Sequence, residues 1–320
     1  MNSRTRAVAA CMLASIAVAT AASAAAPWPD KQIRVIVPWA PGGSTDIVGR
    51  ILSAEMPNTL KQQVIIDNRA GGGSIVGMQL TAAAPPDGYT FMLTSTGYAH
   101  LIQKANVDLV ASFEPVAMVG TADSALVVHP ALPVKTVKDL IQLAKKKPGQ
   151  LLYSSSGIGG FPHMNTELFK LKTGVDLVHV PFKGGGPAIA DTVAGNTQIH
   201  LGSIPTEMAF IKAGKLKVIA VGGRKPNPAL PGVPLIKDTV PGYETYIWYG
   251  YFAPKGTPAS IISRMHAAVT AAVSNPNVVK KLDDQGVEVE KMSSAEFGKL
   301  MKSETDKWLE VINAAGIKGE

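Results

Sequence analysis

The stretch VPWAPGGSTDIVGRIL, residues 37–52, contains the change of periodicity that decides the fold class. Before it, every second residue is apolar, as in a β-strand: Ile33, Val35 and Val37. Within it, apolar residues recur at helical spacing: Ile47, Val48, Ile51 and Leu52. Gly42 and Gly43 let the backbone approach a ligand, and a helix that begins near Ser44 directs free N–H groups at the same space. The stretch therefore predicts a strand, a glycine turn and a helix N-terminus that binds an anion.

Residues 1–24 have the composition of a cleavable signal peptide. Arg4 and Arg6 give a positive start, residues 7–22 are small and apolar in the main, and Ala-Ser-Ala at 22–24 fits the small-x-small cleavage rule. The apolar stretch is shorter than the roughly 20 residues that a membrane-spanning helix needs. A lipoprotein anchor at Cys11 is the alternative, although only four apolar residues precede this cysteine. We expect an exported, periplasmic protein.

The composition of the chain argues against several classes of protein. Cys11 is the only cysteine of the 320 residues, so after cleavage we expect neither disulfides nor thiol chemistry. Loss of the leader lowers the formal net charge from +7 to +5, and the basic residues are spread along the chain without a nucleic-acid motif. We therefore expect no nucleic-acid partner and a mild attraction of anionic solutes.

Units of strand, glycine-containing loop and helix recur along the chain. A second unit runs through residues 150–174, and a third runs through residues 178–196, where Pro187 is expected at the first helical position. Such alternation of strands and helices predicts an α/β protein with a mainly parallel sheet.

The rest of the chain adds one strand and several helices with clear boundaries. A new strand is expected to start at Leu126, and Thr136 with Asp139 predicts a capping box that opens a helix. The C-terminal helices are expected to begin at three further start signals: Thr257-Pro258, Asn275-Pro276 and Ser293 with Glu296.

No low-complexity linker divides the chain, although its length after cleavage suits two domains of ordinary size. Two domains without a linker indicate that the chain crosses from one to the other more than once. The expected boundaries are a signal peptide at 1–24, domain 1 at 25–125 and 248–320, and domain 2 at 126–247.

The sequence lacks the signatures of enzymes, cofactors and metal sites. Its glycine loops contain neither G-x-x-x-x-G-K-[ST] nor G-x-G-x-x-G, and no G-x-S-x-G elbow occurs. His163 and Glu167 fall one helical turn apart, but two ligands do not make a zinc site. We expect no catalytic residue, no cofactor and no metal. An exported enzyme ranks third among the functions that the sequence suggests, and turnover of a carboxylated ester or amide would support it.

Anion binding by neutral groups is the chemistry that the glycine loops favour. A carboxylate accepts hydrogen bonds from backbone N–H groups at a helix start and from Ser or Thr hydroxyls, and each such bond contributes about 1.5–3 kcal/mol. Loop 1 (residues 42–45) and loop 2 (residues 154–160) are expected to hold the ligand between them. The alternative is that these glycine turns only connect strands to helices, as in any parallel sheet.

Several residues near the two loops have two interpretations. Asp46 either complements the helix dipole or pairs with Arg50 at i, i+4, and it should point away from a bound carboxylate. His163 is either a ligand donor or an ordinary residue at a helix N-terminus. Three aromatic residues are either core residues or walls of the pocket: Trp39, Tyr98 and Phe161.

Ordered motifs cover nearly the whole chain after residue 26. They include PWPDKQIRVIVPWAPGGSTDIVGRIL, VIIDNRAGGGSIVG, APPDGYTFML, FEPVAMVG, GVDLVHVPFKGGGPAIADTVAGN, IKAGKLKVIAV and FAPKGTP. Together these motifs resemble the periplasmic substrate-binding proteins of tripartite tricarboxylate transporters, often called the Bug family. The resemblance implies a bilobed type II periplasmic binding fold (Venus flytrap), with two α/β domains joined by crossing strands. It also implies a carboxylated ligand in the cleft between the domains, and membrane transporter subunits as partners.

The match to the family pattern differs between the two loops. Residues 41–46 fit the family's motif fully, whereas loop 2 and the helix start after it fit at five positions: Ser155, Ser156, Gly157, Gly159 and His163. Four positions depart from the pattern: Ile158, Gly160, Phe161 and Pro162. Because these departures remove polar groups and add apolar ones, we expect an aromatic or otherwise apolar carboxylate, a dicarboxylate included, rather than citrate or an acidic amino acid.

The candidate ligand-binding residues combine the two loops with their neighbours: Trp39, Pro41, Gly42, Gly43, Ser44, Thr45, Asp46, Tyr98, Ser155, Ser156, Gly157, Gly160, Phe161, His163, Ser203 and Pro205. We expect a monomer that closes about hinge strands near Leu126 and Trp248 and presents the carboxylate to membrane transporter subunits. The alternative function is the ligand-binding component of a carboxylate-sensing system, which would have the same pocket and a different docking surface.

Overall fold

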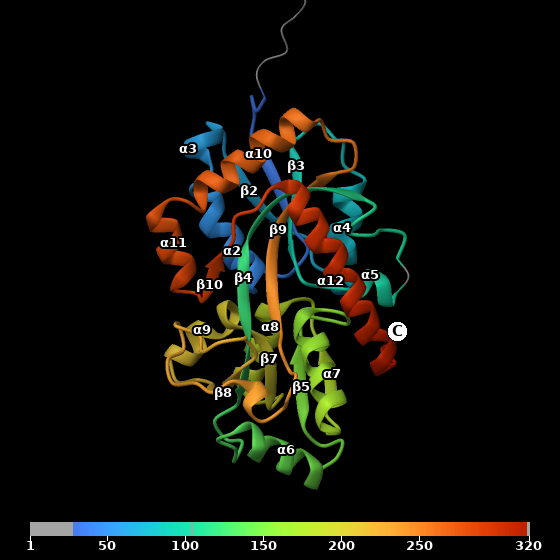
Figure 1. The fold of residues 1–320 in the computed structure, drawn as a ribbon, viewed down its shortest axis with the longest axis vertical. Coiled ribbons are helices and arrows are strands. Elements are labelled where there is room, and N and C mark those ends of the chain that lie inside the picture. The colour runs from blue at the N-terminus through green and yellow to red at the C-terminus, as the bar shows by residue number, and fades with distance from the viewer. Residues whose placement is uncertain (1–27, 104, 319–320) are drawn as a thin grey trace, which may run out of the picture.

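The computed structural model describes residues 28–103 and 105–318, so the expected signal peptide and Cys11 lie outside the described residues. Figure 1 shows two lobes, one above the other, through which the strands β4 (Phe113–Val128) and β9 (Tyr246–Pro254) both run. Within the described residues, no helix is both long enough and apolar enough to cross a membrane.

The first lobe contains both ends of the described chain. Its N-terminal part alternates strands and helices: β1 (Ile33–Val37), α2 (Ser44–Ser53), α3 (Pro57–Leu60), β2 (Val64–Asn68), η1 (Gly72–Ser74), α4 (Ile75–Ala82), β3 (Thr90–Ser95) and α5 (Ala99–Ile102). Its C-terminal part is mainly helical: α10 (Ala259–Ala272), α11 (Pro276–Asp283), β10 (Val287–Val289) and α12 (Ser294–Ala315). β1 lies between β2 and β3 and pairs in parallel with both.

The second lobe is inserted between the two crossing strands. Its elements are α6 (Val137–Lys146), β5 (Leu152–Ser155), α7 (Phe161–Thr173), β6 (Val178–Pro181), α8 (Gly185–Ala194), β7 (Ile199–Ser203), α9 (Ile204–Lys212), β8 (Lys217–Val221) and η2 (Ile236–Asp238). β5 pairs in parallel with β6 and β7, as the repeated strand, loop and helix units predict.

The strands form one ten-stranded sheet with the order β2-β1-β3-β9-β4-β7-β5-β6, to which β8 and β10 add by pairing with β4. The prediction of a mainly parallel sheet is wrong for its centre. β9 pairs antiparallel with β3 and β4, and β4 also pairs antiparallel with β7, β8 and β10. The physical reason is that β4 carries the chain out of the first lobe and β9 carries it back, so the two strands run in opposite directions.

Strand β4 is a single element of 16 residues, so the prediction that a new strand starts at Leu126 is wrong. Residues 126–128 are instead its C-terminal end. The strand is hard to recognise because its register shifts at two bulges and because Gly120 interrupts it. A Cβ atom at Gly120 would lie 2.2 Å from the carbonyl oxygen of Glu288 on β10. β4 changes its partner from β9 to β7 between Asp123 and Ser124.

The helix start signals are confirmed with one exception. Thr136 and Asp139 form the predicted capping box of α6, and Ser293 with Glu296 forms that of α12. The exception is Pro187, which occupies the third position of α8 because the helix already begins at Gly185. The glycines at 185 and 186 belong to the helix and leave room for loop 1 to pack against it.

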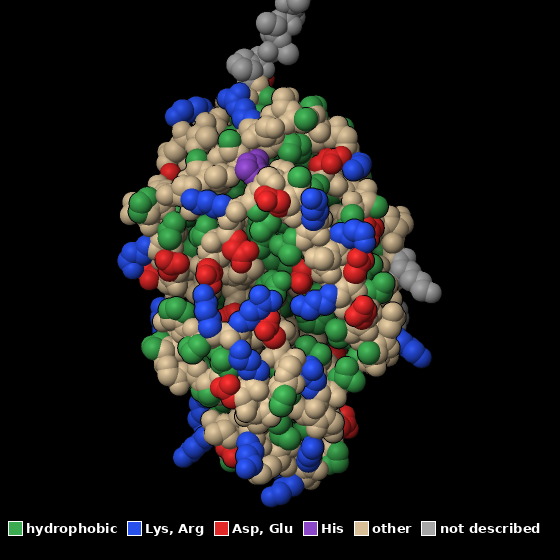
Figure 2. All heavy atoms as spheres, in the orientation of Figure 1, with side chains coloured by type: hydrophobic (Ala, Val, Ile, Leu, Met, Phe, Trp, Pro, Cys, Tyr) green, Lys and Arg blue, Asp and Glu red, His purple; other side chains and the backbone are tan. Residues whose placement is uncertain are grey.

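Each lobe has its own apolar core, and α12 contacts both lobes. The first core packs the sheet against α2, α10 and α11, and the second packs β5 and β7 against α6 and α7. Figure 1 shows α12 running from the first lobe to the side of α7, where Trp308 and Ile312 pack with Tyr98 and Met164. Acidic and basic side chains are interspersed over the face shown in Figure 2, in agreement with their spread along the sequence.

Candidate functional site

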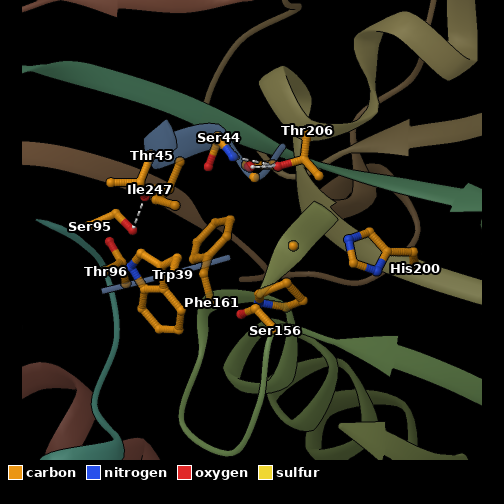
Figure 3. Close-up of a pocket in the computed structure, with 14 residues that line it drawn as sticks. Trp39, Ser44, Thr45, Ser95, Thr96, Ser156, Phe161, His200, Thr206 and Ile247 are labelled. Atoms are coloured by element: carbon orange, nitrogen blue, oxygen red, sulfur yellow. Dashed lines mark hydrogen bonds between the residues drawn. The ribbon is translucent and has the colours of Figure 1, made fainter. Parts of the chain in front are cut away.

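A pocket lies where helices from both lobes begin. Its volume is about 30 Å³, which is room for one or two water molecules. Fourteen residues line it, and Figure 3 shows them around the gap between α2 and the second lobe: Trp39, Gly43, Ser44, Thr45, Ser95, Thr96, Ser156, Phe161, Pro162, Gly185, His200, Ser203, Thr206 and Ile247. The first turns of four helices contribute residues to this lining: α2, α7, α8 and α9. Several helix N-termini therefore face one small space.

Loop 1 brings the N-terminus of α2 to the pocket, as predicted from its two glycines. Gly43 is the N-cap residue in an extended conformation, and Ser44 and Thr45 are buried in the first turn. The Thr45 hydroxyl donates to Ser95 Oγ at 2.8 Å, and the backbone N–H of Ser44 donates to Thr206 Oγ1 at 3.0 Å. Since Thr206 belongs to α9, this second bond joins the two lobes directly beside the pocket (Figure 3).

Loop 2 faces the pocket through Ser156 and is followed there by Phe161. Its other residues hold the loop in shape: Gly157 N–H donates to Ser155 Oγ at 3.1 Å, and Ser155 Oγ also contacts His179 Nε2. Gly157 has a φ of +115°, which is accessible to glycine at little cost. The loop and the residue after it therefore present one hydroxyl and one aromatic ring to the pocket, while the hydroxyls of Ser154 and Ser155 make contacts elsewhere.

Asp46 points away from the pocket, as the sequence interpretation requires. Its carboxylate accepts from Gly42 N–H at 3.0 Å and pairs with Arg50 at 2.9 Å. Burial by itself would raise the pKa of Asp46, but the hydrogen bonds from Arg50 and Gly42 outweigh it and lower the pKa below its usual value. The ionised carboxylate thus braces loop 1 from behind.

His163 and Tyr98 lie next to the pocket without lining it. His163 Nδ1 accepts from Gly159 N–H at 3.0 Å, and the ring stacks on His179 with centroids 4.2 Å apart. Burial lowers the pKa of His163 to about 4, so the ring is neutral at pH 7. Tyr98 is buried and stacks on Trp308 at 5.8 Å. Both residues support the walls of the site.

The structure thus divides the sixteen candidate residues into two groups. The residues that line the pocket are Trp39, Gly43, Ser44, Thr45, Ser156, Phe161 and Ser203. The residues that lie behind or beside it are Pro41, Gly42, Asp46, Tyr98, Ser155, Gly157, Gly160, His163 and Pro205. The first group comes from both loops, from residues next to them and from the end of β7, so loops 1 and 2 lie close together.

Seven further residues line the pocket and were not among the candidates: Ser95, Thr96, Pro162, Gly185, His200, Thr206 and Ile247. Ser95 is the last residue of strand β3 and Thr96 follows it, and a polar residue at the carboxyl end of a parallel strand was a signal that the sequence offered. His200 lies on β7 and Thr206 lies on α9. These two elements approach loop 1 only through the packing of the two lobes, so no local sequence pattern marks either residue as part of the site.

The pocket is electrically neutral and rich in donors. Among the described residues that line it, none is Lys, Arg, Asp or Glu, and His200 is the one histidine. Burial lowers the pKa of His200 to about 4. In residues 28–103 and 105–318, no three or more His, Cys, Asp or Glu side chains are grouped to hold a metal ion. The hydrogen-bonding groups on offer are hydroxyls and the N–H groups of helix starts.

A Ser–His contact beside the pocket resembles part of a catalytic triad and has a different role. Ser154 Oγ lies 2.8 Å from His200 Nδ1, yet both side chains are fully buried, so a substrate has no access to the hydroxyl. The same nitrogen lies 3.1 Å from the Ser154 carbonyl oxygen. This pair fixes the end of β5 against β7.

The family model of the tripartite tricarboxylate transporter family receptor, TctC, matches residues 48–317. The chain belongs to this family. Among curated relatives of the TctC receptor, the protein BugT of Bordetella pertussis is 30% identical over 299 residues, which cover 91% of each chain. The family resemblance that the sequence motifs indicate is therefore confirmed.

Solved structures of similar proteins have the same bilobed architecture. Rpa4515 of R. palustris with adipate has a TM-score of 0.88 and 32% identity, covering 91% of this chain and 99% of the other. MatC of Rhodopseudomonas palustris with bound malate has a TM-score of 0.86 and 29% identity, covering 89% and 100%. The prediction of a bilobed α/β periplasmic binding protein fold is confirmed, and the family is one of solute receptors.

Proposed function

We propose that this TctC receptor captures a small organic carboxylate between its lobes in the periplasm and presents it to the membrane subunits of a tripartite tricarboxylate transporter. The observation that carries the proposal is the neutral, donor-rich pocket formed by helix N-termini of both lobes. A carboxylate held there accepts from hydroxyls and backbone N–H groups without an opposing basic side chain. Support also comes from the adipate and malate named with two similar structures.

Export by a cleavable signal peptide at residues 1–24 is part of the proposal, and it rests on the sequence pattern alone. The proposed mature protein is a monomer without catalytic activity. In support, the Ser154–His200 contact beside the pocket is fully buried, so a substrate does not reach this hydroxyl.

The proposed domains are residues 25–125 with 248–320, and residues 126–247. The change of partner along β4, from β9 to β7 after Asp123, lies within three residues of the first boundary. A pocket of about 30 Å³ is too small for a dicarboxylate, so the lobes must part to admit one. We propose that the segments of β4 and β9 near Leu126 and Trp248 absorb this rotation.

We assign ligand contacts to the residues that line the pocket. The candidates behind it hold these lining residues in position. Ser44, Thr45, Ser156 and Ser203 supply hydroxyls, and the N–H groups of the first turns complete the donor set. Phe161, Trp39 and Ile247 form an apolar wall, which Figure 3 shows on the side of the pocket away from Thr206. This combination favours an apolar or aromatic body attached to the carboxylate.

A thermal-shift screen of refolded, ligand-free mature protein tests the proposal. The panel contains acetate, malate, adipate, citrate, benzoate and phthalate, with adipamide as an uncharged control. A ligand at about 100 times its dissociation constant adds roughly 2.7 kcal/mol, which raises the melting temperature by several degrees. We expect shifts with adipate or with the aromatic acids and none with adipamide. The absence of a shift with every carboxylate would contradict the proposal.

A pair of variants tests the assigned site. Ser44→Leu fills the pocket at the start of α2 and is expected to abolish binding, whereas Ser53→Leu at the other end of the same helix is expected to leave affinity unchanged. Circular dichroism of both variants checks that the fold is retained. Unchanged affinity in Ser44→Leu would remove loop 1 from the site.

A further inference from the structure

His200 and Glu207 form a fully buried ionisable pair at the wall of the pocket. His200 lines the pocket from β7, and Glu207 follows the lining residue Thr206 in the first turns of α9. His200 Nε2 lies 3.9 Å from Glu207 Oε1, and both side chains are 0% exposed. Within the described residues, His200 Nε2 and Glu207 Oε2 have no hydrogen-bond partner. Two unpaired polar atoms at full burial need an explanation.

The hydrogen bonds of His200 favour a proton on Nδ1. This nitrogen lies 3.1 Å from the carbonyl oxygen of Ser154, which only accepts, and 2.8 Å from Ser154 Oγ. A proton on Nδ1 satisfies both contacts, because the Ser154 hydroxyl can accept it and donate onward to Thr192 Oγ1 at 2.8 Å. In the neutral ring, Nε2 then has a free lone pair that requires a donor. The space between Nε2 and Glu207 is kept open by Gly202, where a Cβ atom would lie 2.3 Å from Nε2 and 2.8 Å from Oε1.

Glu207 is the ionisable side chain beside Nε2, and its carboxyl group carries a donor only when it is protonated. Its Oε1 accepts from Gly202 N–H at 2.9 Å, and Oε2, which has no partner among the described residues, is the oxygen left to hold the proton. Burial raises the pKa of Glu207 well above its usual value. The hydrogen bond from Gly202 N–H lowers this pKa, but by less than burial raises it. The dipole of α9 also favours the ionised form, but this effect is smaller than the desolvation of a fully buried carboxylate.

Charged groups on neighbouring elements make contacts elsewhere, and among the described residues none of the basic ones lies within 4.0 Å of the Glu207 carboxyl group apart from His200. On the helices, Asp46 of α2 pairs with Arg50, Asp191 of α8 accepts from Asn196, and Lys212 of α9 itself donates to the Asp284 carbonyl. On α7, Glu167 contacts Lys170 and Tyr153, and His163 accepts from Gly159 N–H. On β4, Asp123 accepts from Asn227 and Glu114 pairs with Lys255. Among the described residues, His200 is the one basic side chain within 4.0 Å of the Glu207 carboxyl group, and full burial favours two neutral groups over an ion pair.

We propose that Glu207 is a positioning residue that must hold a proton for the pocket to bind an anion. The inference rests on the proposed carboxylate function and adds a pH dependence to it. The protonated carboxyl group accepts from Gly202 N–H and lies beside His200 without adding a charge to the turn from β7 to α9, which carries Ser203 and Thr206 into the pocket. Loss of the proton places an unpaired negative charge beside the bound carboxylate and weakens its binding.

A stability comparison tests the protonation without any ligand. Between the ordinary Glu pKa of 4.5 and the higher pKa of Glu207, the folded protein keeps a proton that the unfolded chain releases. The unfolding constant of the wild type is therefore expected to rise about tenfold per pH unit relative to that of Glu207→Gln, which carries an amide in place of the neutral acid. Urea unfolding from pH 5 to pH 9 measures this ratio. A ratio that stays constant over this range would overturn the proposal.

Calorimetric titration with adipate then tests the coupling to the pocket, over a pH range in which adipate stays ionised. The dissociation constants of the wild type and Glu207→Gln are expected to agree within about twofold at low pH. Above the pKa of Glu207 the wild-type constant is expected to rise by up to tenfold per pH unit, while that of Glu207→Gln stays flat.

A buried acid outside the pocket provides the matched control. Glu304 on α12 is 6% exposed and accepts from Tyr246, and Glu304→Gln is expected to keep the wild-type pH profile of binding. Identical profiles for the wild type and Glu207→Gln would overturn the proposal. Failure of adipate and every other carboxylate to bind the wild type would contradict the proposed function instead, and the stability comparison would still decide the protonation of Glu207.

Discussion

The backbone N–H of Ser44 donates to the Thr206 hydroxyl at 3.0 Å, so the first residue of α2 is tied to the first turn of α9 across the pocket. The two residues are 162 positions apart in the sequence and belong to different lobes. Both also line the pocket. Ligand contact and lobe closure are therefore made by the same short segments, and a ligand that binds both segments favours the closed arrangement.

Thr206→Val is expected to weaken ligand binding because it removes the acceptor of this hydrogen bond while keeping the shape of the side chain. The expected loss is about 1 kcal/mol, or roughly fivefold in affinity, measured by calorimetric titration. Small-angle scattering of the ligand-free variant is expected to show a larger radius of gyration. Thr166→Val is the matched control, since the buried Thr166 hydroxyl bonds within its own helix to Pro162 O. Equal losses in both variants would show a general effect on stability.

Gly186→Ala is expected to prevent closure without harming the fold. A Cβ atom at Gly186 would lie 2.2 Å from the carbonyl oxygen of Pro41 on the opposite lobe, so the lobes must move apart to admit it. Alanine is favoured over glycine inside a helix by about 1 kcal/mol, so α8 itself tolerates the change. We expect ligand affinity to fall at least tenfold with an unchanged or higher melting temperature. Gly298→Ala in α12, whose nearest contact is a side-chain atom of Pro115 at 3.2 Å, is expected to retain binding.

Phe161→Asn is expected to change ligand preference more than overall affinity. The aromatic ring is 2% exposed and lines the pocket, so its loss removes apolar contact from an aromatic or apolar ligand body. We expect the affinity for benzoate or adipate to fall about tenfold relative to that for malate, measured as the ratio of dissociation constants. Phe169→Leu is the control, because Phe169 is equally buried on α7 but belongs to the core of the second lobe. An unchanged ratio of dissociation constants in Phe161→Asn would show that Phe161 does not determine ligand preference.

Local signals in the sequence were sufficient for the elements that build loops 1 and 2. The glycine pair before Ser44 marks the start of α2, and the capping residues Thr136 and Ser293 mark α6 and α12, because each signal acts within one helical turn. Phe161, which directly follows loop 2, lines the pocket and also packs with the core of the first lobe, so both interpretations of this residue describe part of its surroundings.

Contacts between distant segments account for what the sequence did not reveal. Strand β4 contains Pro115, Gly120 and Asp123, and its bulges become intelligible only when β9 and β10 are placed beside it. Thr206 and His200 enter the site because β7 pairs with β4 and α9 then packs against α2. Neither residue belongs to a glycine loop, so the local pattern that found loops 1 and 2 passed over them.

The stacked histidines behind loop 2 predict acid sensitivity. His163 and His179 lie 4.2 Å apart, and His179 also stacks on Tyr153 at 4.9 Å. Burial lowers the pKa of His163 to about 4, and burial together with the neighbouring His163 lowers that of His179 to about 3, from the ordinary value of 6.5. Because the unfolded chain takes up protons below pH 6.5 and the folded protein does not, this contribution to stability is complete above pH 6.5 and is lost as the pH falls toward 4.

The expected loss is up to about 1.4 kcal/mol per pH unit for each buried histidine. His179→Phe keeps an aromatic ring in the stack and removes one titrating group, so we expect lower stability at pH 7 through the lost contact with Ser155 and a shallower decline from pH 7 to pH 5. Urea unfolding at the two pH values measures both effects. His129→Gln, in the turn after β4 and outside the stack, is expected to decline as steeply as the wild type. Equal declines from pH 7 to pH 5 in the wild type and His179→Phe would show that the His179 ring is protonated at little cost, and the neutral stack behind loop 2 would then be excluded as a source of acid sensitivity.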